Sequence, residues 1–346
     1  MSATFSAIWQ KHFAGGNSLT SVPLFSGLPF IKHSRLPLYT NMGSTHTKGI
    51  TYNIDPSVSS GFRKKVFLVF DVPKLEKIPL EGPVSLHRYT VKQYPGYALQ
   101  LDGFKDFESY LSHAFKGKSR NKLRSYVKRL EASFNIRYEM FYGKILPETY
   151  DHLFQKLEAL MTKRYEEKQE YNNNLDRREW NFYRELFYPM ILNKQASLFV
   201  TYDNENPIGM MLNYMWGKKL VGAITVFDIC YAKFNLGTVN IMKQIEWCLE
   251  NGISTLDFSK GEFEYKKRWC NISYDFEYHI LFDASSAKSR SLATLLFAFY
   301  SFKNWLRERG INTLMHRMRY LFRKKARFEE SEKTKGPISK FNSSKD

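Results

Sequence analysis

Between Leu220 and Trp269 the chain alternates twice between a β-rich apolar run and a segment with helical spacing. The first run ends at Val226 and is followed by a turn and an amphipathic segment. The second run ends near Asp257, where Gly261 permits a sharp turn before aromatic and basic residues recur at roughly helical spacing. The order strand, helix, strand, helix predicts an α/β fold, in which ligands collect past the carboxyl ends of strands.

Length and composition predict a globular chain with two cores. The chain has 346 residues, of which 43% are hydrophobic, so bulk disorder is not expected. Cys230, Cys248 and Cys270 are far apart and lack the paired spacing of a zinc site or a disulfide framework, so we expect a reducing, cytoplasmic location and no metal. No signal peptide is visible, and the longest nearly uncharged run, residues 291–302, would span only about 18 Å as a helix.

The net charge of +18 is concentrated in two stretches. Residues 288–346 hold 15 Lys and Arg against 5 Asp and Glu, and residues 116–137 hold 8 against 1. Such fields favour an anionic partner, namely an anionic membrane or a phosphorylated donor, although solubility alone would also explain them. Nucleic acid is not expected, because the chain lacks an RRM-type aromatic signature and zinc-finger spacing.

The remaining patterns predict strands and then helices. Residues 66–70, 84–89 and 97–101 read as successive strands after a surface loop at 42–61. The following segments predict, in order, helices at 107–115 and 119–134, a strand at 135–141, helices at 147–168 and 176–192, and strands at 196–202 and 208–216. The polar residues 170–174 lie between the two long helices and are expected near a donor or an acceptor.

From residue 119 to 283 the sequence resembles the GNAT acyltransferase superfamily, and within it the CelD-type acetyltransferase domain related to FemAB aminoacyl transferases. The residues that carry the resemblance are Phe227-Asp228, Asn235 to Ile241, Asp257 to Gly261, Tyr265-Lys266 and Trp269-Cys270. Leu236 replaces the usual proline and Cys270 the closing glycine. Neither departure removes a titratable group.

The resemblance implies a GNAT fold with an α+β mixed sheet, in tandem halves as in FemAB proteins. The predicted parts are a degenerate GNAT-like half (1–115), a basic linking helix (116–134), the acyltransferase domain (135–283), basic amphipathic helices (284–328) and a disordered tail (329–346). The amphipathic helices suit a membrane interface, and they equally suit packing on the body of the protein.

The predicted site combines a carrier pocket with titratable groups. The helix start Asn235-Leu236-Gly237-Thr238 offers free backbone N–H groups to a phosphate, and GNAT enzymes hold the pyrophosphate of the carrier there. We therefore expect acyl-CoA or acyl carrier protein as the cosubstrate, with aminoacyl-tRNA as the FemAB alternative. A tight turn without a ligand remains the plain structural explanation.

Proton removal from an amine requires a base, for which Asp257 and Glu262 are the first candidates and Asp228 the next. Lys266 is expected to bind an anionic acceptor or to stabilise developing charge, as a comparable lysine does in FemAB-like enzymes. The other predicted substrate contacts are Tyr265 and Trp269 as channel walls, and Arg120 and Arg124 as ligands of phosphate or carboxylate. Each of these residues also has a structural explanation, as core or as solvated surface.

The sequence therefore favours an N-acyltransferase acting on the amine of a sugar, an amino acid or an aminolipid, in lipid or cell-envelope biosynthesis. Contact with the inner face of the cytoplasmic membrane is part of this expectation. The alternatives are a FemAB-type aminoacyl-tRNA-dependent transferase, and a non-catalytic basic binder of membrane or nucleic acid.

Overall fold

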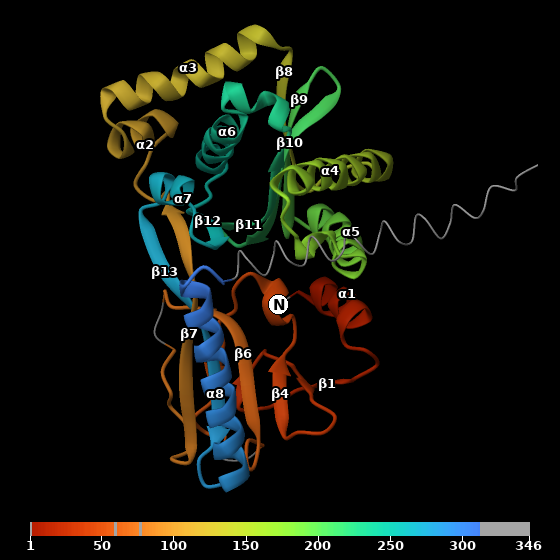
Figure 1. Cartoon of the computed structure of the whole chain (residues 1–346), viewed down its shortest axis with the longest axis vertical. Coiled ribbons are helices and arrows are strands. Elements are labelled where there is room, and N and C mark those ends of the chain that lie inside the picture. Colours follow the sequence, from red (N-terminus) through yellow and green to blue (C-terminus); the bar gives the residue numbers. More distant parts are fainter. Residues whose placement is uncertain (1, 59–60, 76–77, 312–346) are drawn as a thin grey trace, which may run out of the picture.

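A computed structural model describes residues 2–58, 61–75 and 78–311 of the chain (Figure 1). The predicted amphipathic helices beyond residue 311 and the predicted tail at 329–346 lie outside the described residues. Within these residues, no helix combines the length and the apolar character that crossing a bilayer requires.

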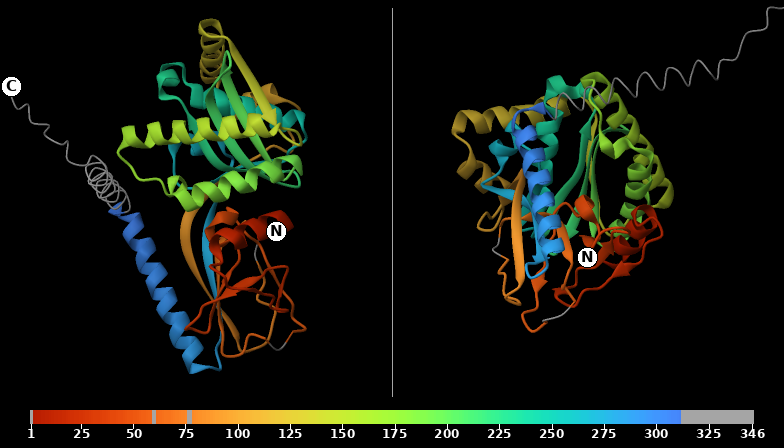
Figure 2. Two further views of the ribbon diagram at one scale, coloured as in Figure 1. Left: turned by 90° about the vertical axis from the view of Figure 1, so that its right-hand side faces the viewer. Right: turned by 60° about the horizontal axis from the view of Figure 1, so that its bottom comes forward.

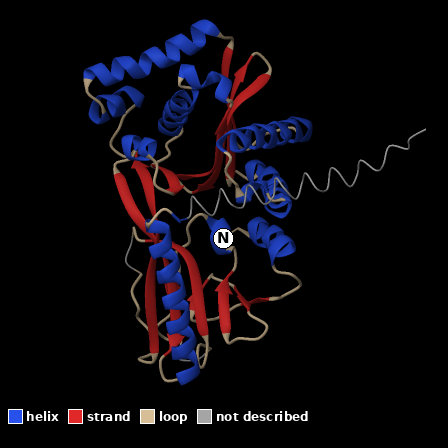
Figure 3. Ribbon diagram, in the orientation of Figure 1, coloured by secondary structure: helices blue, strands red, loops and turns tan. Residues whose placement is uncertain are grey.

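A sheet of eleven strands runs the length of the molecule (Figure 3). The strands are β1 (Leu19–Thr20), β2 (Phe25–Ser26), β3 (Phe30–Lys32), β4 (Leu38–Asn41), β5 (Asn53–Ile54), β6 (Val66–Pro73), β7 (Leu86–Gln100), β8 (Ile136–Phe141), β9 (Ala196–Asp203), β10 (Asn206–Trp216), β11 (Lys219–Phe227), β12 (Thr255–Lys260) and β13 (Ile272–Asp283). The sheet has the order β1-β3-β4-β6-β13-β7-β12-β11-β10-β9-β8, and β2 pairs with β5 separately. Only β4–β6 and β11–β12 are parallel pairs among the described strands, so the predicted mixed α/β sheet is confirmed.

The helices cover both faces of this sheet (Figures 1 and 2). They are α1 (Ala3–Phe13), α2 (Phe107–Ala114), α3 (Gly117–Ser133), α4 (Pro147–Lys168), α5 (Arg177–Leu192), α6 (Leu236–Glu250), α7 (Glu264–Trp269) and α8 (Ala287–Glu308), with short 3₁₀ helices η1 (Ser44–Thr47), η2 (Asn173–Leu175) and η3 (Ile229–Phe234). Apolar side chains of α1, α4 and α5 pack on one face of strands β8 to β11. Those of α2, α3 and α6 pack on the other face, and α8 lies along β6, β7 and β13.

The strand β13 connects the two predicted halves of the protein. It belongs to the C-terminal part of the sequence, yet it pairs with β6 on one side and with β7 on the other. The segment 1–115 therefore lacks the strand that joins its own two longest strands. The halves share one continuous sheet.

Three local features differ from the sequence-based expectations. The predicted strands at 84–89 and 97–101 are one strand, β7, in which a register shift opposite Asp275 and Glu277 accommodates an extra residue before Pro95. Residues 3–13, for which the sequence patterns predicted no helix, form the helix α1, with Ser2 as its N-cap. The predicted surface loop 42–61 buries Met42, Ile50 and Tyr52, because it packs against the body of the sheet.

Candidate functional site

The two parallel strands β11 and β12 separate within the sheet. They pair only over residues 219–221 and 255–257. Just beyond the paired residues of β11, a bulge interrupts its pairing with β10, opposite Leu212 and Asn213. A cavity of about 410 Å³ lies at this separation, lined by residues 222–225 of β11 and 256–260 of β12. Its other walls come from α4, the loop at 172–174, β10, α6, α7 and Lys48. The position agrees with the rule that ligands bind past the carboxyl ends of parallel strands.

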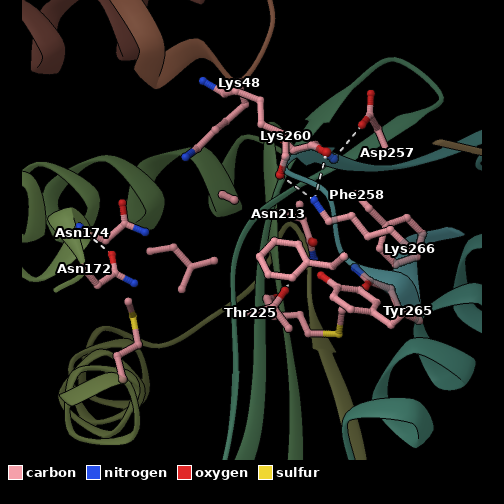
Figure 4. A pocket seen from close by; sticks show the side chains of 18 of the residues that line it. Lys48, Asn172, Asn174, Asn213, Thr225, Asp257, Phe258, Lys260, Tyr265 and Lys266 are labelled. Atoms are coloured by element: carbon pink, nitrogen blue, oxygen red, sulfur yellow. Dashed lines mark hydrogen bonds between the residues drawn. The ribbon is translucent and has the colours of Figure 1, made fainter. Parts of the chain in front are cut away.

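Lys266 is the most buried cation of the cavity, with a side chain only 3% exposed. Its Nζ donates to the backbone carbonyls of Ser259 at 3.0 Å and of Lys260 at 2.6 Å (Figure 4). Burial lowers the pKa of Lys266 to about 8, because desolvation disfavours the charged amine. An ammonium has three donors, so one N–H is left for a ligand.

Four further cations line the cavity: Lys48, Arg164, Lys168 and Lys260. Lys260 pairs with the buried Asp71, while Lys48 forms no ion pair within the described part of the chain. Burial lowers the pKa values of both lysines. Figure 4 shows Lys48 and Lys260 on the same side of the cavity as Asp257. The site is strongly electropositive and predicts an anionic ligand.

Asp257 lines the cavity, and its carboxylate contacts three other residues. It accepts hydrogen bonds from the Tyr274 hydroxyl at 2.9 and 2.7 Å and from the Ser259 N–H at 2.7 Å, and it lies 2.8 Å from the Nζ of Lys219. Burial and the carboxylate raise the pKa of Tyr274. This network fixes the position of the Asp257 side chain.

The other predicted bases lie outside the cavity. Glu262 is exposed and pairs with Lys267 at 2.6 Å, and this contact lowers the pKa of Glu262. Asp228 caps η3 through the Cys230 N–H at 3.0 Å and pairs with Lys163 at 3.0 Å. Both carboxylates have local structural partners.

The predicted substrate contacts are divided between the cavity and the core. Tyr265 lines the cavity. Trp269 is buried against Phe115 and Tyr110, whose hydroxyl donates to the Trp269 carbonyl at 2.8 Å. Arg120 donates to the Phe115 carbonyl at 3.2 Å, and Arg124 pairs with Glu108, so both arginines join α2 to α3.

The predicted phosphate site at Asn235–Thr238 does not contribute to the lining of the cavity among the described residues. Leu236 is fully buried, and a Cβ on Gly237 would lie 2.7 Å from the Phe227 ring, so Gly237 allows α6 to approach β11. Bulky substitution of Gly237 would therefore disturb packing whether or not a phosphate binds. The N–H groups of Leu236 and Gly237 still have no acceptor within the described residues, which keeps this turn a candidate anion site.

Several cavity residues were missed by sequence reasoning. Lys48 belongs to the segment predicted as a surface loop, and Arg164 and Lys168 belong to a helix recognised only by its apolar stripe. Asn172 and Asn174 do lie in the polar segment 170–174 that was expected near a donor or an acceptor. A lone lysine beside Gly49 carries no sequence signal, because only the fold brings it to β12.

A second cavity of about 300 Å³ shares Lys48 and Asp257 with the first. Its walls include the segment 47–51 and the apolar residues Val221 and Phe276. The two cavities therefore meet at a lysine and a carboxylate. The described residues contain no group of three His, Cys, Asp or Glu side chains that could hold a metal ion.

Comparison with known proteins agrees with this geometry. Residues 117–267, which include β11, α6, β12 and most of α7, match the family described as acetyltransferase (GNAT) domain. A comparison with curated proteins found no match.

Solved structures share the fold over most of the chain at low sequence identity. FemX has a TM-score of 0.52 and 11% identity, covering 80% of this chain and 90% of its own. The C-terminal domain of a protein named as a lysylphosphatidylglycerol synthetase from Agrobacterium fabrum has a TM-score of 0.53 and 11% identity, covering 85% and 95%. A conserved protein of unknown function from Bacteroides thetaiotaomicron has a TM-score of 0.50 and 12% identity, covering 81% and 90%. The resemblance noted in the sequence is confirmed: residues 117–267 match the acetyltransferase (GNAT) domain, within a chain whose fold is similar to that of FemX.

Proposed function

We propose that this protein is an N-acyltransferase that moves an acyl group from acyl-CoA or acyl carrier protein to the amine of an anionic acceptor. The observation that carries the proposal is the cavity at the separation of β11 and β12. Its wall holds five cationic residues, Lys48, Arg164, Lys168, Lys260 and Lys266, and one carboxylate, Asp257, among the described residues. This excess of positive charge suits the phosphate of a carrier and a phosphate or carboxylate on the acceptor.

The proposed reaction needs charge stabilisation and proton removal. The acceptor nitrogen attacks the thioester carbonyl, a C–N bond forms, the C–S bond breaks, and the thiolate leaves while the nitrogen loses a proton. The remaining N–H of Lys266 would stabilise the oxyanion or hold the anionic acceptor. Asp257 is the carboxylate of the cavity wall and stays the proposed base, with Tyr274 and Lys219 fixing its position.

A direct experiment measures free thiol released by the purified protein from a panel of acyl-CoA thioesters, with amino sugars, amino acids and aminolipids as acceptors. Lys266→Met should lower the release about 100-fold or more, because it removes the buried donor. Lys267→Met is the matched control, since Lys267 is exposed on the same helix and pairs with Glu262. The proposal fails if no thioester in the panel is consumed, or if the two variants behave alike.

An aminoacyl-tRNA donor is the second candidate, and the fold of FemX keeps it open. The expected mark of such an enzyme is a long helical arm for tRNA, and the helices predicted within residues 147–192 are too short and too apolar to form one. In the structure α4 and α5 instead pack along the sheet, with buried residues such as Leu157 and Phe187 on their inner faces. This packing favours the thioester donor, and acyl transfer that depends on added tRNA would reverse the choice.

The exposed face of α8 supports an acceptor at an anionic membrane. One face of α8 packs on the sheet through Leu292, Leu296 and Tyr300. The neighbouring side of α8 exposes large apolar side chains, with exposed fractions of 67% for Leu295, 57% for Phe299, 59% for Phe302 and 45% for Trp305. Lys288, Arg290, Lys303, Arg307 and Arg309 belong to the same segment. An apolar stripe among cations is typical of helices that lie in a membrane interface.

Co-sedimentation with vesicles tests this membrane contact. The wild type should bind vesicles that contain phosphatidylglycerol and not vesicles of phosphatidylcholine alone. The double variant Leu295→Ser/Phe302→Ser should lose binding, whereas Val84→Ser, which changes an apolar residue that is 97% exposed elsewhere, should keep it. Equal binding by both variants would contradict the proposal.

A further inference from the structure

The carboxylate of Asp257 is directed toward the second cavity. Among the residues that the structure describes, its partners Tyr274 and Lys219 line the second cavity and not the first. Figure 4 shows the carboxylate pointing away from Tyr265, a wall residue of the first cavity. Lys266, in contrast, lines the first cavity and not the second. An amine that meets the proposed base Asp257 therefore enters through the second cavity.

A third cavity, of about 470 Å³, lies next to the second. The two share six wall residues: Thr47, Gly49, Ile50, Thr51, Tyr214 and Trp216. The rest of the third wall includes residues of α1, the C-terminal end of α5 and the turn between β10 and β11. We call the second and third cavities together the side groove. It extends between residues 47–51 on one side and 214–217 on the other.

Charge decreases along the side groove. The second cavity has Lys48, Lys219 and Asp257 in its wall. In the described part of the chain the third cavity has one charged wall residue, Lys194, and its Nζ lies 5.9 Å from the centroid of the Tyr142 ring, which is not part of the wall. The end of the groove far from Asp257 is therefore electrically neutral.

The walls of the side groove are largely apolar. Six apolar wall residues keep a small exposed fraction, between 5% and 8%: Phe5, Ile50, Met190, Tyr214, Met215 and Val221. Trp216 belongs to both cavities and is 62% exposed, so its ring lies at the rim of the groove. Apolar walls with a few polar groups at one end suit a ligand that is polar at one end and apolar along its body.

We propose that the acceptor is an aminolipid, an amine beside a phosphate or carboxylate that is joined to an apolar chain lying in the side groove. The amine meets Asp257, the anionic group meets Lys48, and the chain follows the apolar walls toward Trp216. The inference rests on the proposed acyltransferase function and selects one class among its acceptors. An amino sugar or a free amino acid would leave the third cavity without a ligand group.

The test compares three acceptors that share an amine and a phosphate: O-phosphoethanolamine, a short-chain lysophosphatidylethanolamine below its critical micelle concentration, and glucosamine 6-phosphate. The KM of each is measured from the thiol released from an acyl-CoA. The KM for lysophosphatidylethanolamine should be about 100-fold lower than for the other two, because burying roughly four methylenes corresponds to such a factor. Equal KM values, or a lower one for glucosamine 6-phosphate, would overturn the inference, while the thiol release itself would uphold the proposed function.

Thr51→Trp blocks the groove without changing the core, because Thr51 is exposed and lines both the second and the third cavity. It should raise the KM for lysophosphatidylethanolamine about tenfold and leave that for O-phosphoethanolamine within about twofold. Thr45→Trp is the matched control, since Thr45 is exposed in the same segment and lines none of the three cavities. Trp216→Ala should give a smaller loss, about threefold, with the lipid alone. Equal losses with both acceptors in Thr51→Trp would overturn the inference.

Two further measurements separate the side groove from the exposed apolar residues of α8 and from the reaction itself. The double variant Leu295→Ser/Phe302→Ser should keep the preference for the lipid, and loss of the preference there but not in Thr51→Trp would assign the chain to α8 and overturn the inference. Calorimetry without an acyl donor measures lipid binding alone. Binding that Thr51→Trp weakens, without thiol release from any thioester, would uphold the groove and overturn the proposed function. Absence of lipid binding by the wild type would overturn the inference.

Discussion

Two basic regions of the protein, the helix α3 and the cavity, hold their charge in opposite ways. On α3 the cations follow one another along the sequence and face solvent, and Arg124 is paired with Glu108. In the cavity the cations come from distant segments and are largely buried, as Lys48, Lys260 and Lys266 are. Dense charge along the sequence thus marks a solvated helix, whereas the cavity is built from single lysines and arginines.

The difference is energetic as well as geometric. A drop in the pKa of Lys266 from 10.5 to about 8 corresponds to roughly 3 kcal/mol of destabilisation for the charged form in the folded protein. The exposed ion pair on α3 has no comparable desolvation cost, because water solvates both partners. A buried ammonium that donates only to backbone carbonyls is therefore the better indicator of a ligand site.

The largest effect is expected for Lys266, whose activity and stability should respond to pH in opposite directions. Below pH 8 the amine is protonated and can bind an anion, so kcat/KM should fall about tenfold per pH unit above 8. The unfolded chain binds more protons than the folded one between pH 8 and 10.5, so the free energy of unfolding should rise over that window. Rate profiles and denaturant titrations across this window measure both.

Lys266→Met supplies the reference for these profiles. It should remove the pH dependence of stability in this window, and it should be at least as stable as the wild type at pH 7, with an advantage that shrinks toward pH 10.5. Wild-type activity that increases as the pH rises through 8 would show instead that the neutral amine of Lys266 is the active form and acts as a base.

Lys48 should give the next largest effect. It forms no ion pair within the described residues and lies where the two cavities meet, so Lys48→Met should raise the KM for the acceptor about tenfold and leave kcat within about twofold. Lys64→Met is a control, because Lys64 also lies in the N-terminal part and contributes to neither cavity. A change confined to kcat would move Lys48 from acceptor binding to the chemical step.

Local sequence patterns predicted the elements well where one periodicity dominates. The helix α4 has the predicted bounds, because Pro147 suits the first helical turn and buried residues such as Leu153, Leu157 and Met161 recur at helical spacing. The helix α1 was missed, since Phe5 and Trp9 are too few to mark a periodicity and gain their burial from α5 and the sheet. The position of β13 between β6 and β7 depends on long-range pairing that local patterns do not contain.

The sequence predicted cavity residues only within the strand–turn–helix segment that begins at Asp257, because that segment itself forms part of the cavity wall. Asp257, Tyr265 and Lys266 line the cavity as expected of neighbours in one strand–turn–helix segment. Trp269 lies one helical turn from Tyr265, but its large apolar surface is buried with Tyr110 and Phe115. The third cavity is lined by residues of α1, α5 and β10, which only the fold brings together.

The smallest effect is expected for the arginines of α3. It tests the comparison of the two basic regions through the exposed one. The double variant Arg120→Ala/Arg124→Ala removes charges that contact Phe115 and Glu108 on the protein itself, so kcat/KM with acyl-CoA should change less than about twofold. The same assay with an acyl carrier protein as donor sharpens the result. A tenfold loss confined to that donor would mean that α3 docks the acidic carrier, because CoA lacks the protein surface that such a helix would contact. The two basic regions would then serve one substrate, the exposed one by docking and the buried one by chemistry, and the contrast between them would describe two stages of a single reaction.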